Sequence, residues 1–335
     1  MSKKIVFSGV QPSGEIHLGN YLGALKQFVE LQHDNDCIFS IVDLHAITVW
    51  QDPGTLGNRT REALAIFIAC GLNPEKNIIF NQSQVSEHSQ LAWYLNCTAR
   101  VGWLNRMTQF KDKAGKNKEV ASVGLYTYPI LMAADILLYN ATHVPVGDDQ
   151  KQHLELVRDI AQKFNNDYKQ DYFILPEPLV NKMATRIMSL RDGSKKMSKS
   201  DPSEQSRIMM TDSNDQIVKK IMKAKTDSLN MPNTIEEADK RPEISNLINI
   251  FVSCSEISKQ KVIDDFASKE ISVFKKELIN AITNTVKPIA DETKKLIGDE
   301  SYLDNLLAQG AKKAKLIASK SILEIEEVIG VAYQK

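Results

Sequence analysis

A single carboxylate stands in an otherwise apolar stretch of the chain. Residues 128–139 read Tyr-Pro-Ile-Leu-Met-Ala-Ala-Asp-Ile-Leu-Leu-Tyr and predict a buried helix that begins at Pro129. Burying the charge of Asp135 there costs several kcal/mol unless the carboxylate is paired or strongly hydrogen-bonded. Met132 shares its helix face, whereas Tyr128 precedes the proline and is expected to lie outside the helix, closing one end of a pocket. Asp135 therefore either binds a ligand that donates a hydrogen bond or pairs with an arginine or lysine elsewhere in the chain.

Glycines and short polar side chains follow the first apolar run. Residues 11–20 read Gln-Pro-Ser-Gly-Glu-Ile-His-Leu-Gly-Asn, which is neither a Walker loop nor a G-x-G-x-x-G fingerprint. Gly14 and Gly19 let the backbone approach a ligand closely. The start of the next helix offers free N–H groups to a phosphate, and Ser13 and Asn20 add short polar side chains. The alternative is a plain strand–turn–helix connection.

Lysines gather in a second loop, where residues 195–201 read Lys-Lys-Met-Ser-Lys-Ser-Asp after Asp192-Gly193. Three ammonium groups in so short a stretch repel one another unless a polyanion lies near. A mobile loop of this kind suits a clamp that closes on phosphate as negative charge develops. A solvated surface loop would have the same composition.

A third polar segment, residues 144–150, reads Val-Pro-Val-Gly-Asp-Asp-Gln. Gly147 permits close approach of a ligand, while the carboxylates of Asp148 and Asp149 and the amide of Gln150 suit sugar hydroxyls or an amino group. One of the two aspartates is alternatively the N-cap of the helix that follows.

The elements that must position these residues alternate along the first 201 residues. Strands are predicted at residues 5–10, 37–47, 78–80 and 143–146, and helices at residues 19–31, 55–71, 87–110, 129–139 and 149–164. This alternation predicts an α/β fold with a doubly wound, parallel, Rossmann-type sheet, whose ligands bind beyond the carboxyl ends of the strands. After Pro202 the pattern is helical. We therefore expect a catalytic domain over residues 1–201 and an all-helical domain over residues 202–335.

Composition sets limits on the function. The chain has 335 residues, of which 42% are hydrophobic and 25% charged, and this length fits two domains. Because no apolar run could span a bilayer and no signal or transit segment is evident at the start, we expect a cytoplasmic protein without membrane contact. Basic and acidic residues number 42 each, so any nucleic-acid contact must come from local lysine clusters. Such clusters, each alternatively a solvated face, occupy residues 111–118, 219–225 and 312–320.

The cysteines give no sign of a metal centre. They are widely spaced and form no C-x-x-C pair, which predicts reduced thiols. Their positions are Cys37, Cys70, Cys97 and Cys254.

Taken together, the two loops resemble the signatures of class I aminoacyl-tRNA synthetases. Residues 17–20, His-Leu-Gly-Asn, are similar to the H-x-G-H signature with Asn in the last position, and residues 196–200 read K-M-S-K-S, the second signature. Segments 7–14, 43–48, 128–139 and 144–153 look like those of bacterial tryptophanyl-tRNA synthetases, in which that Asn is normal. The resemblance extends over essentially the whole chain.

This resemblance implies that the protein activates L-tryptophan with ATP and transfers it to the 3′-terminal adenosine of tRNA(Trp). Asp135 would accept the indole N–H. The implied tryptophan site consists of Phe7, His45, Tyr128, Met132, Asp135, Val144, Val146 and Gln150. The implied ATP site consists of Gln11, Pro12, Ser13, His17, Gly19, Asn20, Gly147, Asp148, Asp149, Ile187, Lys196, Met197, Ser198, Lys199 and Ser200. Lys113, Lys196 and Lys199 would bind the pyrophosphate end and act in catalysis.

The resemblance also implies cofactors and partners. ATP would bring Mg²⁺, with no tightly bound cofactor and no protein metal site. The protein would form a homodimer whose tRNA crosses both subunits, with the helical region reading the anticodon. Three alternatives remain: a tyrosyl-tRNA synthetase, a small-acid adenylyltransferase of the same superfamily, and a non-enzymatic RNA-binding relative.

Overall fold

Five parallel strands form the centre of the molecule. The computed structural model describes residues 3–12, 16–108, 110, 121–147, 150–179, 186–199 and 201–331. Its sheet has the order β3-β2-β1-β4-β5, and every neighbouring pair is parallel. The strands are β1 (Ile5–Val10), β2 (Asp36–Ile41), β3 (Ile78–Asn81), β4 (His143–Pro145) and β5 (Glu177–Leu179). Because the strand order reverses between β1 and β4, a crevice is expected at their carboxyl ends.

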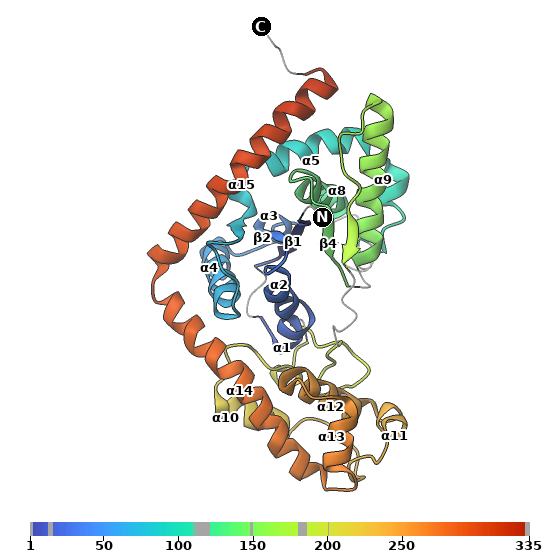
Figure 1. The fold of residues 1–335 in the computed structure, drawn as a ribbon, viewed down its shortest axis with the longest axis vertical. Helices are drawn as coiled ribbons and strands as arrows, with labels where there is room; N and C mark the ends of the chain where they lie inside the picture. The colour runs from blue at the N-terminus through green and yellow to red at the C-terminus, as the bar shows by residue number, and fades with distance from the viewer. Residues whose placement is uncertain are drawn as a thin grey trace.

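Helices cover both faces of this sheet, which confirms the predicted doubly wound fold (Figure 1). The helical segments up to residue 168 are α1 (Leu18–Asn20), the π-helix η1 (Tyr21–Leu25), α2 (Lys26–Leu31), α3 (Asp43–Ala46), α4 (Pro53–Ala69), the 3₁₀ turn η2 (Gln82–Gln84), α5 (Glu87–Thr98), α6 (Val101–Leu104), α8 (Val123–Leu137) and α9 (Lys151–Tyr168).

Side chains of the central strands alternate between two apolar cores. Phe39 of β2 packs with Phe28 of α2 and Phe67 of α4 in one core. Ile38, the preceding residue of β2, packs in the other core with residues of α5, α8 and α9. The alternation follows from the two-residue period of a strand, and it explains why these strands are apolar on both sides.

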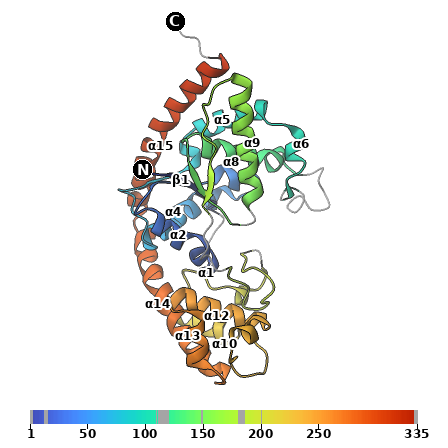
Figure 2. The ribbon, with the colours of Figure 1, turned by 45° about the vertical axis from the view of Figure 1, so that its right-hand side comes forward.

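Beyond residue 202 the described part of the chain is built from helices. They are the 3₁₀ turn η5 (Glu204–Ser206), α10 (Asn214–Met222), α11 (Ile235–Asp239), α12 (Pro242–Ser255), α13 (Lys259–Phe266), α14 (Ile271–Ile297) and α15 (Glu300–Ile329). Helices α10 to α13 and the first part of α14 form a lower lobe beneath α1 (Figure 2). No helix among the described residues is both long and apolar enough to cross a membrane.

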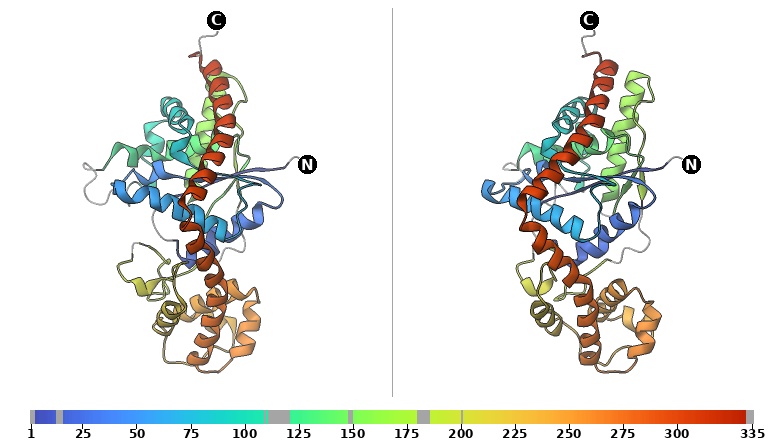
Figure 3. Two further views of the ribbon diagram at one scale, coloured as in Figure 1. Left: turned by 90° about the vertical axis from the view of Figure 1, so that its left-hand side faces the viewer. Right: turned by 60° about the vertical axis from the view of Figure 1, so that its left-hand side comes forward.

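The last two helices join this lobe to the sheet. Helix α14 packs against α4, and α15 packs against the edge strand β3 and against α5. Figure 3 shows α15 crossing the side of the sheet on its way to the far end of the molecule. The C-terminal helices therefore brace the sheet as well as forming the lower lobe.

Several elements differ from the sequence-based expectation, and the helix predicted over residues 87–110 is broken into α5 and α6 at Ala99 and Arg100. The strand predicted to reach residue 47 ends at Ile41, because Asp43 starts the short helix α3 and accepts hydrogen bonds from the backbone N–H groups of Leu44 and Ser83. Helix α8 begins at Val123, where the Ser122 hydroxyl caps the N–H of Leu125, so Pro129 lies inside it.

The expectation that Tyr128 lies outside the helix is therefore wrong, because the Ser122 cap starts the helix earlier. Strand β5 was not predicted, since it is short and contains Pro178.

Candidate active site

A cavity of about 330 Å³ lies at the carboxyl end of β1, beside β4. The residues around it come from β1, α3, α8, β4 and the start of α9. All eight residues predicted for tryptophan line this cavity: Phe7, His45, Tyr128, Met132, Asp135, Val144, Val146 and Gln150. The crevice at the reversal of strand order thus contains the predicted amino-acid pocket.

The carboxylate of Asp135 lies at the base of this cavity and is almost completely buried. Its Oδ1 accepts hydrogen bonds from Gln82 Nε2 and His88 Nδ1, both at 2.6 Å, and its Oδ2 accepts one from His45 Nε2 at 2.9 Å. Burial favours the protonated acid, but the hydrogen bonds from His45 and His88 outweigh it and hold the pKa of Asp135 below its usual range. The carboxylate is therefore ionised, and its partners are imidazoles and an amide rather than the arginine or lysine of the alternative explanation.

One acceptor position remains on this carboxylate. Each carboxylate oxygen can accept about two hydrogen bonds. Oδ1 already accepts two, whereas Oδ2 accepts one, from His45. Since His45 lines the cavity and Gln82 and His88 do not, the open position belongs to the side of Asp135 that faces the cavity.

His88 is oriented from behind by Tyr139. Its Nε2 lies 2.8 Å from the Tyr139 hydroxyl. Burial, followed by the negative charges of Asp135 and Glu87, raises the pKa of Tyr139, so its hydroxyl stays protonated and donates to His88. The Nδ1 of His88 then carries a proton and donates it to Asp135.

Aromatic rings form the walls of the cavity. Phe7 stacks on Tyr139 with 5.7 Å between ring centroids, and Tyr128 meets the ring of His45 edge-on at 6.1 Å. The Tyr128 hydroxyl lies 2.7 Å from His153 Nε2, and burial raises the pKa of Tyr128 to about 12. These contacts fix a flat, apolar slot above the Asp135 carboxylate.

A second cavity, of about 600 Å³, adjoins the first. Gly9 and Gln11 line both cavities, so the two cavities adjoin at the carboxyl end of β1. Seven residues predicted for ATP line the second cavity: Gln11, His17, Asn20, Lys196, Met197, Ser198 and Lys199.

The other residues predicted for ATP and pyrophosphate divide into three groups. Gly19 lies against this cavity's wall, because a Cβ there would come within 3.1 Å of the His17 ring and 3.5 Å of Met197 Cβ. Pro12 and Ile187 are buried and Gly147 is exposed, and none of the three lines the cavity. Ser13, Lys113, Asp148, Asp149 and Ser200 lie outside the described residues.

His17 and Asn20 cap the first helix reciprocally. The Asn20 N–H donates to His17 Nδ1, and the His17 N–H donates to Asn20 Oδ1, both at 3.2 Å. Burial, with the nearby charges of Lys199, Arg207 and Lys196, lowers the pKa of His17 to about 4. His17 is therefore neutral at pH 7, with its proton on Nε2, and it can donate a hydrogen bond to a phosphate without carrying a charge.

The lysine loop is held at both ends. Within it, the N–H of Met197 donates to the carbonyl of Ile187, which precedes the loop, at 3.0 Å. After it, the segment 208–210 pairs with the first loop: Leu18 N–H donates to Ile208 O, and Met210 N–H donates to Ile16 O, both at 2.8 Å. Lys196 and Lys199 therefore face the same cavity as His17 and Asn20.

Sequence reasoning missed Gln82 and His88. Gln82 directly follows β3, so its place at the carboxyl end of a strand was a usable signal. His88 lies in α5 with no spacing that relates it to Asp135, and only the packing of α5 on α8 reveals it. Within the described ranges, no cluster of His, Cys, Asp or Glu side chains has the grouping of a metal site.

Comparison with known proteins gives one consistent result. The family described as tRNA synthetases class I (W and Y) matches residues 2–287. The tryptophan–tRNA ligase of Caulobacter vibrioides is 54% identical over 326 residues, which cover 97% of this chain and 95% of that protein.

Two solved structures are also similar over nearly their full length. The tryptophanyl-tRNA synthetase of Mycoplasma pneumoniae has a TM-score of 0.84 at 33% identity and covers 99% of both chains. The enzyme of Campylobacter jejuni, complexed with ADP and tryptophan, has a TM-score of 0.83 at 34% identity and covers 97% of this chain and 99% of that one. The chain belongs to the class I aminoacyl-tRNA synthetases, in the family that comprises the tryptophan and tyrosine enzymes.

Proposed function

We propose that this protein is a tryptophan–tRNA ligase, which forms tryptophanyl-adenylate from L-tryptophan and ATP and then transfers tryptophan to tRNA(Trp). The observation that carries the proposal is the open acceptor position of Asp135 in an apolar slot next to a lysine-lined cavity. The names of the full-length relatives support the same activity, and the ligands of the Campylobacter jejuni enzyme support a nucleotide and tryptophan as the two occupants.

Tryptophan is the amino acid that matches the slot. Indole has one hydrogen-bond donor and no acceptor, and Asp135 Oδ2 offers one open acceptor position. Phenylalanine would leave that position desolvated and unpaired, and sites of this kind reject analogues that lack the donor by about 10⁴–10⁵-fold. Discrimination at this single atom pair removes the need for a separate editing site.

The reaction needs positioning more than proton transfer. The tryptophan carboxylate, already an anion, attacks the α-phosphorus of ATP in line, and pyrophosphate leaves as the mixed anhydride forms. Gln11 stands at the junction of the two cavities, where the reacting atoms meet. The 2′-hydroxyl of the terminal adenosine of tRNA then attacks the carbonyl carbon of the adenylate and releases AMP.

Charge stabilisation comes from the two loops. Lys196 and Lys199 neutralise the departing pyrophosphate, and Lys113 is the third cation of the proposal. His17 and Asn20 donate neutral hydrogen bonds to the phosphates. Mg²⁺ bound to the phosphates of ATP would supply further charge neutralisation. Gly147, Asp148 and Asp149 lie next along the chain from β4 and are the proposed ribose contacts.

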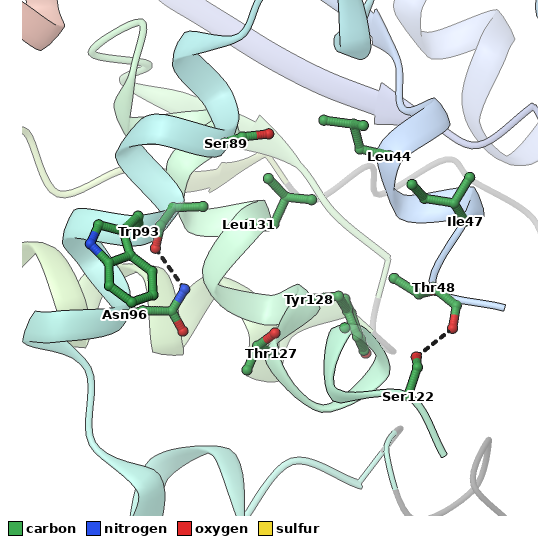
Figure 4. A pocket seen from close by; sticks show the side chains of 12 residues that line it. Leu44, Ile47, Thr48, Ser89, Trp93, Asn96, Ser122, Thr127, Tyr128 and Leu131 are labelled. Atoms are coloured by element: carbon green, nitrogen blue, oxygen red, sulfur yellow. Dashed lines mark hydrogen bonds between the residues drawn. The ribbon is translucent and has the colours of Figure 1, made fainter. Parts of the chain in front are cut away.

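A homodimer is the proposed assembly. An apolar cavity of about 460 Å³ opens where α3, α5 and α8 meet (Figure 4), and Tyr128 lines both this cavity and the tryptophan slot. Ile47 and Trp93 on its rim are 56% and 68% exposed, and Val123 beside it is 77% exposed. Contiguous exposed apolar side chains of this size mark a protein interface, here with a second copy of the chain.

tRNA is the remaining partner. We place its anticodon arm on the lower lobe. The boundary between the catalytic domain and the helical domain, after residue 201, is also part of this proposal. Since the reaction serves protein synthesis, the enzyme acts in the cytoplasm.

Pyrophosphate exchange with each of the twenty amino acids, followed by charging of tRNA(Trp), tests the function. We expect ATP–pyrophosphate exchange with tryptophan and charging only of tRNA(Trp). Exchange with tyrosine instead would favour the tyrosyl alternative. Exchange without charging would favour an adenylyltransferase. Binding of tRNA without exchange would favour a non-enzymatic RNA-binding protein.

A further inference from the structure

Arg207 occupies the junction between the two signature loops. Its guanidinium Nη1 donates to the carbonyl of Asp201 at 2.9 Å and to the carbonyl of Ser203 at 3.2 Å. These carbonyls belong to the turn in which the lysine loop ends. One cation thus closes the turn at the loop's C-terminal end.

The backbone immediately after Arg207 is paired with the first loop. Ile208 accepts a hydrogen bond from Leu18, and Met209 forms an isolated antiparallel bridge with His17. The charge of Arg207 also acts on the His17 ring, together with those of Lys196 and Lys199. Arg207 therefore contacts the end of the lysine loop and also lies beside the first loop, which contains His17.

A buried ion pair between Asp212 and Lys220 anchors the segment that follows Arg207, residues 208–212. Asp212 Oδ2 accepts hydrogen bonds from the N–H of Met209 at 2.8 Å and from Lys220 Nζ at 2.5 Å. The side chains of Asp212 and Lys220 are only 5% and 7% exposed. Breaking a buried pair of this kind leaves an uncompensated charge and costs several kcal/mol. Residues 208–212 cannot shift easily, so the turn that Arg207 closes is held in one place.

Helix α14 contacts the end of α10, the helix that carries Lys220. Lys275 Nζ, from α14, donates to the carbonyl of Ala224 at 2.7 Å and to that of Met222 at 3.2 Å, just where α10 ends. The segment that carries Arg207 is therefore fixed to the lower lobe as well as to the first loop.

We propose that Arg207 is a positioning residue for ATP activation, which sets the lysine loop at the correct distance from the His17 loop. Without its two bonds the turn at Asp201 and Ser203 is free to move, and Lys199 no longer meets the pyrophosphate in a fixed geometry. The inference rests on the proposed function, since it assigns the loop to pyrophosphate.

The substitution Arg207→Met tests this proposal, with Arg207→Lys as the conservative variant. Arg158→Met is the matched control, because Arg158 Nη1 also donates to two carbonyls, those of Leu175 and Pro176, outside both cavities. In pyrophosphate exchange we expect Arg207→Met to lower kcat/KM for ATP by about tenfold or more, the value of one or two charged hydrogen bonds. KM for tryptophan and the thermal midpoint should stay near wild type, and Arg207→Lys should recover part of the loss.

Two results would overturn it. One is kcat/KM for ATP within about twofold of wild type in Arg207→Met, a change smaller than a single hydrogen bond would give. The other is an equal loss for ATP and tryptophan together with a lower thermal midpoint, which indicates a purely structural role. If Arg207→Met does not fold, Arg207→Lys decides by the same criteria. A wild-type enzyme without tryptophan-dependent exchange would instead refute the proposed function.

Discussion

The Asp135 carboxylate illustrates how far a single residue can be interpreted from sequence. Its apolar surroundings predicted burial and a need for hydrogen bonds. Its partners could not be predicted, because His45, Gln82 and His88 come from three segments that only the folded chain brings together. The lysine loop was easier to find, since its charges are adjacent in the sequence, but a solvated surface loop would have the same composition, and only the cavity that the loop shares with His17 and Asn20 favours a phosphate site.

His17 makes a prediction about pH. Its pKa is about 4 in the folded protein and 6.5 when unperturbed. The unfolded chain therefore binds a proton below pH 6.5 that the folded protein does not bind until about pH 4. Stability from this group is present above pH 6.5 and is lost as the pH falls towards 4. Between pH 7 and 5 the wild type should lose about 1–2 kcal/mol more than His17→Gln.

Urea unfolding at pH 7 and pH 5 measures this difference. The comparison with His17→Gln removes the contributions of all other titrating groups, which the two proteins share. Equal pH dependence in both proteins would mean that the pKa of His17 is the same in the folded protein as in the unfolded chain.

At the scale of elements, most of the helices and the strands β1 to β4 followed from the sequence pattern. The errors have local causes. A serine cap starts α8 six residues before Pro129. The second strand ends earlier than predicted, because Asp43 begins the short helix α3. A capping side chain can begin or end an element at a residue that the hydrophobic pattern does not indicate, so the pattern alone does not fix the boundary.

Gly310 makes a prediction about how α15 meets the sheet. A Cβ on this residue would stand 1.7 Å from the carbonyl oxygen of Ile79 in β3. Gly310→Ala must therefore push α15 away from the strand that leads to Gln82. We expect a loss of about 2 kcal/mol or more in the free energy of unfolding and a higher KM for tryptophan.

Gly57→Ala in α4 is the matched control for urea unfolding of Gly310→Ala. A Cβ there meets no atom within 4 Å, so alanine should leave stability unchanged or raise it by up to about 1 kcal/mol. Equal stability of the two variants would show that α15 does not approach β3 so closely.

At the scale of the whole molecule, the helical C-terminal region was predicted but its return to the sheet was not. The apolar stripe of α15 showed that one face is buried, yet it did not indicate what covers that face. The contact of α15 with β3 joins residues more than two hundred positions apart, and no local pattern encodes such a pairing.

The proposed dimer makes a prediction at this scale. Trp93→Glu places a charge on the rim of the apolar cavity and should shift the protein from dimer to monomer in sedimentation velocity. Leu316→Glu, at a side chain 72% exposed on α15, is the control and should leave the dimer intact. A wild-type protein that sediments as a monomer at micromolar concentration would contradict the proposed assembly.

The central claim is that the open acceptor of Asp135 receives the indole N–H. The most direct measurement compares kcat/KM in pyrophosphate exchange for tryptophan and for 3-(1-benzothiophen-3-yl)alanine, in which sulfur replaces the N–H with little change of shape. In the wild type we expect tryptophan to be favoured by at least about a hundredfold, and in Asp135→Ala, whose side chain has no acceptor, we expect that preference to collapse to near unity. Equal use of both amino acids by the wild type would contradict the account.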